Sequence, residues 1–281
     1  MLVEHKFGFL PEPVAIKEPH FAIRPLADFR QHVDGVCSAT TRDGFWLYPP
    51  CREGRSQQRI SLPCTHVLEG SDISSDVARY LIAVFGLLNG LRLVPEQGIH
   101  FYRVCVERHG LVDFVATDRA IRRVLNLAFD LWVNGSDPIR RNLVGALHWH
   151  LFSRSYEHSF EVFAAEYTVL DACWKIHTLM NTEPSTPHAL RIARLSKAHD
   201  IPLPSWAAID SGNTSYLSRL RNDLIHEALY ARHPIGFAVP KGFSRIWLEL
   251  HWFNSRLLLA LLGENGSYIH TQFMHARALL E

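Results

Sequence analysis

Residues 216–230 read YLSRLRNDLIHEALY, and this stretch says most about the fold of the chain around it. On a helix, at about 100° per residue, its apolar side chains fall within roughly 100° of Arg221 on either side. These side chains are Leu217, Leu220, Leu224, Ile225, Ala228 and Leu229. The spacing predicts an amphipathic helix with Arg221 inside the apolar stripe and with Asn222 and His226, four residues apart, along one edge of it.

An arginine inside an apolar stripe needs a reason, because a buried guanidinium is costly unless an anion or several acceptors meet it. In one interpretation, Arg221 forms a structural ion pair with an acid on a neighbouring helix, and His226 is an ordinary residue at the helix edge. In the other, Arg221 and His226 line a cleft and act on a phosphate. The spacing alone leaves both interpretations open.

The composition of the chain excludes several classes of protein. The 281 residues are 47% hydrophobic and 20% charged, which excludes global disorder and suits one or two domains. The formal net charge of +1 excludes a globally basic nucleic-acid coat and leaves room only for local basic patches.

The cysteines and the apolar runs indicate the cellular compartment of the protein. The 5 cysteines are odd in number and form no C-x-x-C pair, which predicts reduced thiols and a cytoplasmic protein. The start, MLVEHKFGFLPEP, is charged and contains proline, so it does not resemble a signal peptide. No strongly apolar run approaches the roughly 20 residues of a membrane span, so we expect no membrane partner.

The two halves of the chain differ in their local patterns. Residues 1–116 predict an α+β domain, with short strands at 44–48 and 59–62 and a capped helix from about 72 to the Asn89-Gly90 pair. Residues 99–107 and 111–116 predict a hairpin across His109-Gly110. Residues 117–281 predict an all-α domain. Its helices are expected at 118–133, 137–153, 156–181, 187–199, 213–231, 242–262 and 267–280.

The pair Arg221 and His226, with Asn222 after the arginine, resembles the R-x-x-x-x-H signature of the HEPN superfamily. The context resembles bacterial HEPN proteins of the ApeA-like kind over roughly residues 155–265. Residues 160–179 resemble their long central helix, residues 189–194 the short helix before the motif, and residues 201–206 the loop between them. The resemblance implies an all-α HEPN-like helical bundle in the second domain.

The resemblance also implies an activity, that of a metal-independent endoribonuclease. The 2′-hydroxyl of RNA can attack the adjacent phosphate if a side chain moves protons and another stabilises the phosphate charge. His226 suits proton transfer near neutral pH, and Arg221 can hold phosphoryl oxygens through its planar fork. Asn222 can orient His226 or donate to the phosphate. Asp171, on the helix expected at 156–181, can fix Arg221 if that helix packs against the motif helix, with Glu166 on the same helix as its competitor.

Arg221 and His226 lie about 140° apart on an ideal helix, so one copy of the pair is expected to splay rather than converge. HEPN proteins place two such pairs across a two-fold axis, and we therefore expect a homodimer through this domain. RNA is the expected partner. The candidate RNA-binding residues are Arg191, Arg194, Lys197 and Arg219. Each of these basic residues can equally belong to a solvated helix face.

Metal ligands were sought because the chain has 17 histidines. His148 and His150 are two residues apart and diverge on a helix, and Cys64-Thr-His66 lacks a paired partner motif. His226-Glu227 does not begin an H-E-x-x-H zinc motif, because residue 230 is Tyr and not His. We therefore expect no metal and no cofactor.

Three hypotheses follow for the whole chain. The first is a HEPN-type endoribonuclease in prokaryotic antiviral defence or a toxin-like system, with residues 1–116 as a sensor, a substrate-selecting part or the docking site of a protein or effector partner. The second is a non-catalytic HEPN module that binds RNA, nucleotide or a protein partner. The third is a structural subunit in which Arg221 merely pairs with Asp171, so that Arg221→Ala destabilises the fold by about 3–5 kcal/mol.

Overall fold

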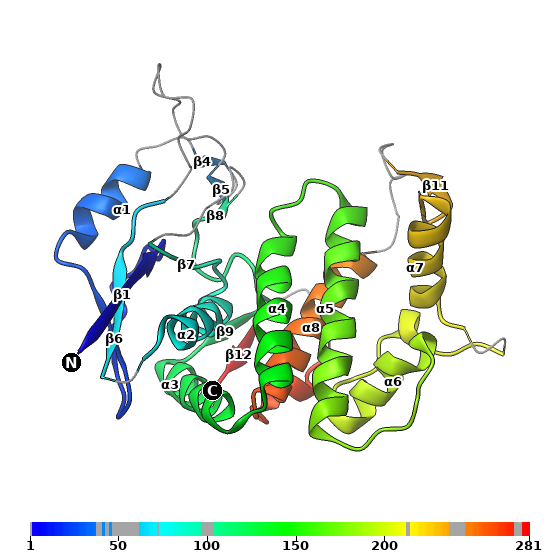
Figure 1. Ribbon diagram of the computed structural model, residues 1–281. Helices are drawn as coiled ribbons and strands as arrows, with labels where there is room; N and C mark the ends of the chain where they lie inside the picture. The colour runs from blue at the N-terminus through cyan, green and yellow to red at the C-terminus, as the bar shows by residue number, and fades with distance from the viewer. Residues whose placement is uncertain are drawn as a thin grey trace. The chain divides into compact units, whose positions relative to one another are not determined.

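The computed structural model describes residues 2–37, 41–42, 45–46, 62–71, 73–96, 104–211, 214–235, 245–272 and 277–281. The chain divides into two compact units, Met1–Val133 and Asn134–Glu281. The first contains a small sheet and the second is mainly helical, which makes the chain an α+β mixture (Figure 1). The expected boundary at 116/117 lies one helix earlier, because α3 (Asp118–Asn134) groups with the first unit.

The first unit is built on a five-stranded sheet with the order β2-β3-β6-β1-β7. Neighbouring strands pair antiparallel, with Phe7 opposite His66 and Ile23 opposite Leu68. The strands are β1 (Val3–Gly8), β2 (Ile16–Lys17), β3 (Ala22–Pro25), β6 (His66–Gly70) and β7 (Val94–Pro95). The Phe7 and Phe85 rings meet edge to face at 6.0 Å, which joins the sheet to helix α2 (Ser75–Asn89) in one apolar core.

Helix α2 begins at Ser75, later than the expected start at about 72, and it is capped at both ends. The Ser74 hydroxyl accepts a hydrogen bond from the Val77 backbone N–H, and Gly90 follows the last turn at a φ of 61°. A Cβ at Gly90 would lie 2.6 Å from the Cα of His109, so both the conformation and the space favour glycine there. The helix expected to end at Asn89-Gly90 is confirmed at that end.

Two predicted elements are wrong. Among the described residues, the hairpin across His109-Gly110 does not form, because β8 (Val104–Cys105) pairs with β5 (Phe45–Trp46) and not with β9 (Phe114–Ala116). The helix expected at 267–280 is replaced by a 3₁₀ turn, η2 (Ser267–His270), and by β12 (Ala278–Leu280). Of the strand expected at 44–48, the structure describes Phe45–Trp46 as β5. Residues 44, 47–48, 59–61, 72, 99–103, 213 and 242–244, which belong to other predicted elements, lie outside the described residues.

The remaining elements of the first unit are short. They are helix α1 (Phe29–Cys37) and strand β4 (Thr41–Arg42), which pairs with β5.

The second unit also contains short elements. A 3₁₀ turn, η1 (Ser205–Ala207), lies at the end of the loop expected at 201–206. A two-stranded ribbon of β10 (Leu229–Tyr230) and β11 (His233–Pro234) follows helix α7 (Tyr216–Glu227).

The second unit consists of helices packed around α5 (Ser159–Met180). Helices α4 (Asp137–Ser153) and α8 (Ile246–Leu261) pack against α5 and against each other. Helices α6 (His188–Ala198) and α7 (Tyr216–Glu227) contact α5 and each other (Figure 1). Among the helices of the described residues, none combines the length and the apolar composition that crossing a membrane requires.

Candidate functional site on helix α7

Helix α7 carries the Arg221–His226 motif and is fixed at its first turn. The Ser215 hydroxyl accepts from the Ser218 backbone N–H at 3.1 Å, and the Ser218 hydroxyl accepts from the Ser215 N–H at 2.9 Å. Leu217 and Leu220 are buried and hold this turn against the rest of the unit. The helix ends at Glu227, earlier than expected, because Ala228 adopts a left-handed conformation at a φ of 53°.

The apolar stripe expected along α7 is buried over only part of its length. Leu217 and Leu220 are buried, but Ile225 is 59% exposed and Leu224 is only partly buried. Arg221 itself is partly exposed, so the expectation that it sits within a buried face is wrong. Helical periodicity places residues on one side of a helix, but only neighbouring elements decide how far along the helix that side is covered.

The three motif side chains meet on this exposed edge. Arg221 Nη1 lies 3.1 Å from Asn222 Oδ1 and 3.2 Å from His226 Nε2. A guanidinium can only donate, so His226 Nε2 accepts through its lone pair. The expected splay of the pair is therefore wrong, because the long arginine side chain spans the 140° between the two positions.

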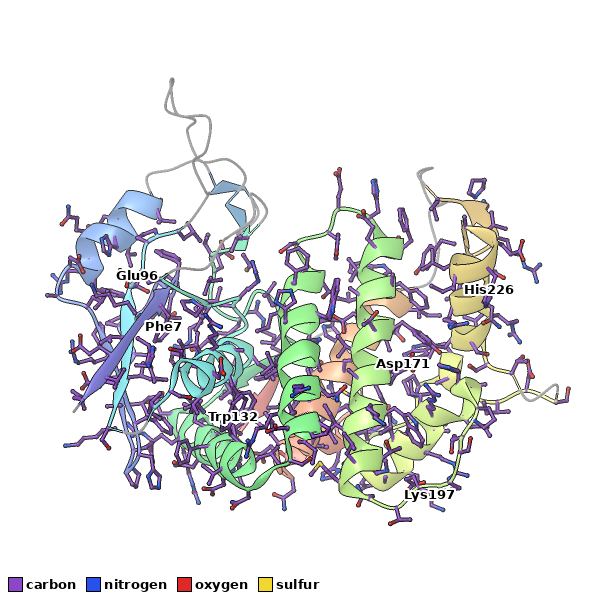
Figure 2. The ribbon with its side chains drawn as sticks, in the orientation of Figure 1. Phe7, Glu96, Trp132, Asp171, Lys197 and His226 are labelled. Carbon is purple, nitrogen blue, oxygen red and sulfur yellow. The ribbon has the colours of Figure 1, made fainter. Side chains whose placement is uncertain are left out.

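Asp171 does not meet Arg221. Its Oδ1 accepts a hydrogen bond from Arg191 Nη1 at 2.8 Å and lies 3.4 Å from His188 Nδ1, and both partners belong to α6. Figure 2 shows Asp171 on α5 and His226 on α7, separated in the view. The structure therefore brings Arg221, Asn222 and His226 together and directs Asp171 to another arginine.

The four candidate RNA-binding residues differ in their availability. Arg191 is paired with Asp171 and lies over the Trp174 ring at 5.9 Å. Arg194 pairs with Glu183 at 3.2 Å, and Arg219 pairs with Asp210. Lys197 is exposed, and Figure 2 places it at the far end of α6 from the position of His226. Three of the four charges are therefore already partnered by acids of the same unit.

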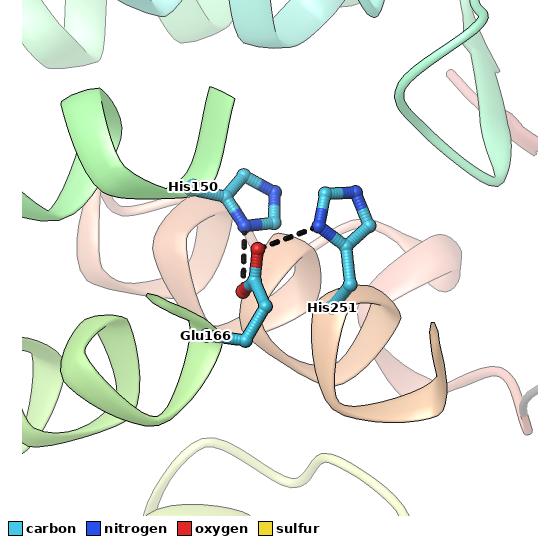
Figure 3. A group of neighbouring side chains, drawn as sticks. All are labelled: His150, Glu166 and His251. Carbon is cyan, nitrogen blue, oxygen red and sulfur yellow. Dashed lines mark hydrogen bonds and ion pairs between the residues drawn. The ribbon is translucent and has the colours of Figure 1, made fainter. Parts of the chain in front are cut away.

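A second polar group, formed by His150, Glu166 and His251, was not found from the sequence. Glu166 Oε2 accepts from His150 Nδ1 at 3.0 Å, and Glu166 Oε1 accepts from His251 Nδ1 at 2.7 Å (Figure 3). All three side chains are buried, and they come from α4, α5 and α8. Histidines 101 residues apart share no local spacing, so only the packing of three helices brings them together.

Glu166 keeps its charge in this buried place. Burial by itself would raise its pKa, but the charges and hydrogen bonds of His150 and His251 outweigh burial and lower the pKa below its ordinary value. The one local signal in the sequence is a glutamate between apolar residues of a helix, and the sequence alone makes it a possible partner of Arg221. The structure excludes that role, because the carboxylate faces α4 and α8.

Comparison of the chain with protein-family models, with curated proteins and with solved structures finds no match to any of them. What α7 can do chemically therefore follows from its own side chains and from their surroundings.

Proposed function

We propose that the chain is a HEPN-type, metal-independent endoribonuclease whose catalytic residues are Arg221, Asn222 and His226. The observation that carries the proposal is their mutual contact on the exposed edge of α7. These contacts support the proposal, because they gather a proton acceptor, a guanidinium that can bind phosphate and an amide on one edge of the helix. The resemblance of residues 155–265 to HEPN helices supports the same activity.

The reaction needs no group beyond RNA and these side chains. His226 Nε2 takes the proton of a 2′-hydroxyl, the 2′-oxygen bonds to phosphorus, and the bond from phosphorus to the 5′-oxygen breaks. The products are a 2′,3′-cyclic phosphate and a 5′-hydroxyl end. Arg221 stabilises the charge that develops on the phosphoryl oxygens.

The resting contacts suggest how RNA starts the reaction. In the free protein the Arg221 guanidinium donates a hydrogen bond to the lone pair of His226 Nε2. A phosphate binds a guanidinium more strongly than a neutral imidazole does, because the phosphate is charged and accepts two parallel hydrogen bonds. Binding of the phosphate therefore draws Arg221 away and frees His226 to act as the base.

We propose that two chains assemble through the HEPN-like domain, so that the His226 of a second copy donates the proton to the leaving 5′-oxygen. The first unit then serves as a sensor, as the part that selects substrate, or as the docking site of a protein or effector partner. A role in prokaryotic antiviral defence or in a toxin-like system follows from the family resemblance alone.

A non-catalytic module that binds RNA, nucleotide or a protein partner is the second candidate. Two observations favour it: Asp171 bonds Arg191 instead of Arg221, and the Arg221 guanidinium covers the lone pair that a base would use. In this case Arg221 still binds phosphate, but no linkage is cut. The two candidates differ in one observable quantity, the formation of new RNA ends.

The test is a cleavage assay on mixed-sequence RNA in EDTA, with folding verified by circular dichroism in the same buffer. We expect the wild type to leave 2′,3′-cyclic phosphate ends and His226→Ala to leave the RNA intact. His148→Ala is the matched control, because His148 is an exposed histidine of α4 outside the motif. Cleavage that persists in His226→Ala contradicts the mechanism. Binding of RNA without cleavage by the wild type supports the module.

A further inference from the structure

His150, Glu166 and His251 form a compact set of potential metal ligands in the core of the second unit. One ligand atom from each residue lies within 4.8 Å of the other two. Figure 3 shows both imidazole rings directed at one carboxylate, with the rings nearly parallel at 4.1 Å between centroids. Since the three residues are at most 1% exposed, whatever joins them joins three helices.

The hydrogen bonds around His150 indicate a cation between its ring and Glu166. The Ser255 hydroxyl donates to the His251 carbonyl at 3.1 Å, so it accepts from His150 Nε2 at 3.0 Å. Nε2 therefore carries a proton, and Nδ1 faces Glu166 either as a second N–H or as a bare lone pair beside a metal ion. Histidines that bind metals almost always donate from their other ring nitrogen in this way.

The charge of the site calls for the same cation. The Glu166 carboxylate is fully buried, so a negative charge on it needs a positive charge close by. Among the described residues its hydrogen bonds come from His150, Ser153, His251 and Asn254, and from no Lys or Arg. A buried charge without an opposite charge is costly, so either a proton on a histidine or a metal ion must balance it.

Oxygen atoms beside the three residues can complete a coordination shell. Ser153 Oγ lies 2.6 Å from Glu166 Oε1 and 3.4 Å from His251 Nδ1. Asn254 is fully buried, and its Oδ1 has no hydrogen-bond partner among the described residues. Its Nδ2 donates to Glu166 Oε2 at 2.7 Å, so the amide borders the site, and a buried amide oxygen without a donor is rare.

We propose that His150, Glu166 and His251 bind a divalent transition-metal ion, with Zn²⁺ as the best match to two imidazole nitrogens and a carboxylate. The ion replaces the protons on the two Nδ1 atoms. Ligands about 2.0–2.2 Å from a tetrahedral ion lie roughly 3.4 Å from one another, so the contacts of 2.7 and 3.0 Å open by about half an ångström. This site is structural, because it is buried on all sides, and it is independent of the function proposed for α7.

The test uses the full chain, purified without chelators and without a histidine tag. We expect about one metal ion per chain by mass spectrometry of the metals. After removal of the metal, Zn²⁺ at about 100-fold above its Kd should raise the Tm by roughly 5–10 °C. Co²⁺ in its place should give the visible absorption of a low-symmetry nitrogen and oxygen site.

Two variants separate this site from the other histidines. His251→Gln keeps a hydrogen-bond donor for Glu166 but removes a nitrogen ligand, so it should lose the stoichiometric ion and the Tm shift. His148→Ala, on the same helix as His150 but exposed, should keep both. Neither variant alters α7, so loss of the ion and loss of RNA cleavage are separate outcomes.

The proposal is overturned if the wild-type chain is isolated without metal and its Tm does not respond to Zn²⁺ or Co²⁺. In that case a proton on a histidine balances the charge of Glu166. Equal binding of Zn²⁺ by His251→Gln overturns it as well. If His251→Gln fails to fold, the stoichiometry and the Co²⁺ spectrum of the wild type still decide.

Discussion

The second unit contains two histidine groups that differ in every physical respect. In the His150–Glu166–His251 group, the carboxylate accepts four hydrogen bonds from side chains and no member is more than 1% exposed. In the Arg221–Asn222–His226 group, Arg221 donates to Asn222 and to His226, and the edge is exposed. The first group has its hydrogen-bond partners inside the core, whereas the second retains donors on an exposed edge.

The difference shows how to separate a group that holds the fold from one that can act on a ligand. A buried charge must be matched by groups or ions held in the core, because water cannot reach it, and its removal leaves several groups unpaired. An exposed charge is solvated, so its contacts contribute little to folding and can be exchanged for a substrate at little cost. The sequence pattern had placed Arg221 in the first class, and the structure places Glu166 there.

The largest expected effect is that of Glu166→Ala. It leaves two histidines, Ser153 and Asn254 without their common acceptor, and we expect it to lower the free energy of unfolding by about 3–5 kcal/mol. Urea unfolding followed by circular dichroism measures this loss. A loss below about 1 kcal/mol would show that Glu166 contributes no more to stability than the exposed group, which would contradict the distinction drawn between the two groups.

His226→Ala should have a large effect on RNA cleavage and a small effect on stability, the opposite of Glu166→Ala. Removal of a proton-transferring side chain is expected to slow RNA cleavage by about 10²- to 10⁴-fold. Because the imidazole is exposed, the free energy of unfolding should change by less than about 0.5 kcal/mol. The cleavage rate and the urea midpoint are measured on the same preparation. A variant that loses stability together with activity would show that the two groups do not differ as described.

His66, in β6 of the first unit, adds a third environment, that of a buried histidine bonded to uncharged groups. Its Nε2 accepts from the Val14 N–H at 3.3 Å and its Nδ1 lies 3.0 Å from Thr65 Oγ1. Burial lowers its pKa to about 4, against a smaller opposing effect of the Glu12 backbone. The unfolded chain, with a pKa near 6.5, therefore binds more protons between pH 6.5 and 4, and acid favours unfolding in that window.

The contribution of His66 is thus complete above about pH 6.5 and is lost as the pH falls towards 4. Between pH 7.5 and 5.0 the wild type should lose about 2 kcal/mol more stability than His66→Gln, measured by urea unfolding at each pH. The difference between the two proteins isolates His66 from His199, whose pKa burial and His177 also lower to about 4. Equal losses would mean that His66 is protonated in the folded state.

The smallest expected effect is that of Arg221→Ala on stability. A buried ion pair with Asp171 would have made this change cost about 3–5 kcal/mol. With Arg221 partly exposed and Asp171 bonded to Arg191, we expect a change within about 0.5 kcal/mol. Thermal and urea unfolding of Arg221→Ala beside Arg191→Ala test this, and the Arg191 variant should be the less stable of the two. The reverse order would restore the structural role of Arg221.

Local signals account for most of what was predicted correctly. Helix α4 has the expected bounds, α3 differs from expectation by one residue, and α2 ends at its predicted glycine. Periodicity, capping residues and proline act over a few residues, so they can be read without knowledge of the fold. The hairpin at His109-Gly110 failed because strand pairing is set by distant partners, here β5 for β8.

The sequence by itself determined the helical character of the second half, the ends of several helices and the position of Arg221, Asn222 and His226 on one helix, since all of these depend on neighbouring residues. Only the tertiary structure decided which polar groups are buried. It paired Asp171 with Arg191, left no buried residue on α7 beyond Leu220, and joined His150, Glu166 and His251 from three helices. Burial and partner choice depend on which elements pack together, and no spacing along one segment of chain encodes that packing.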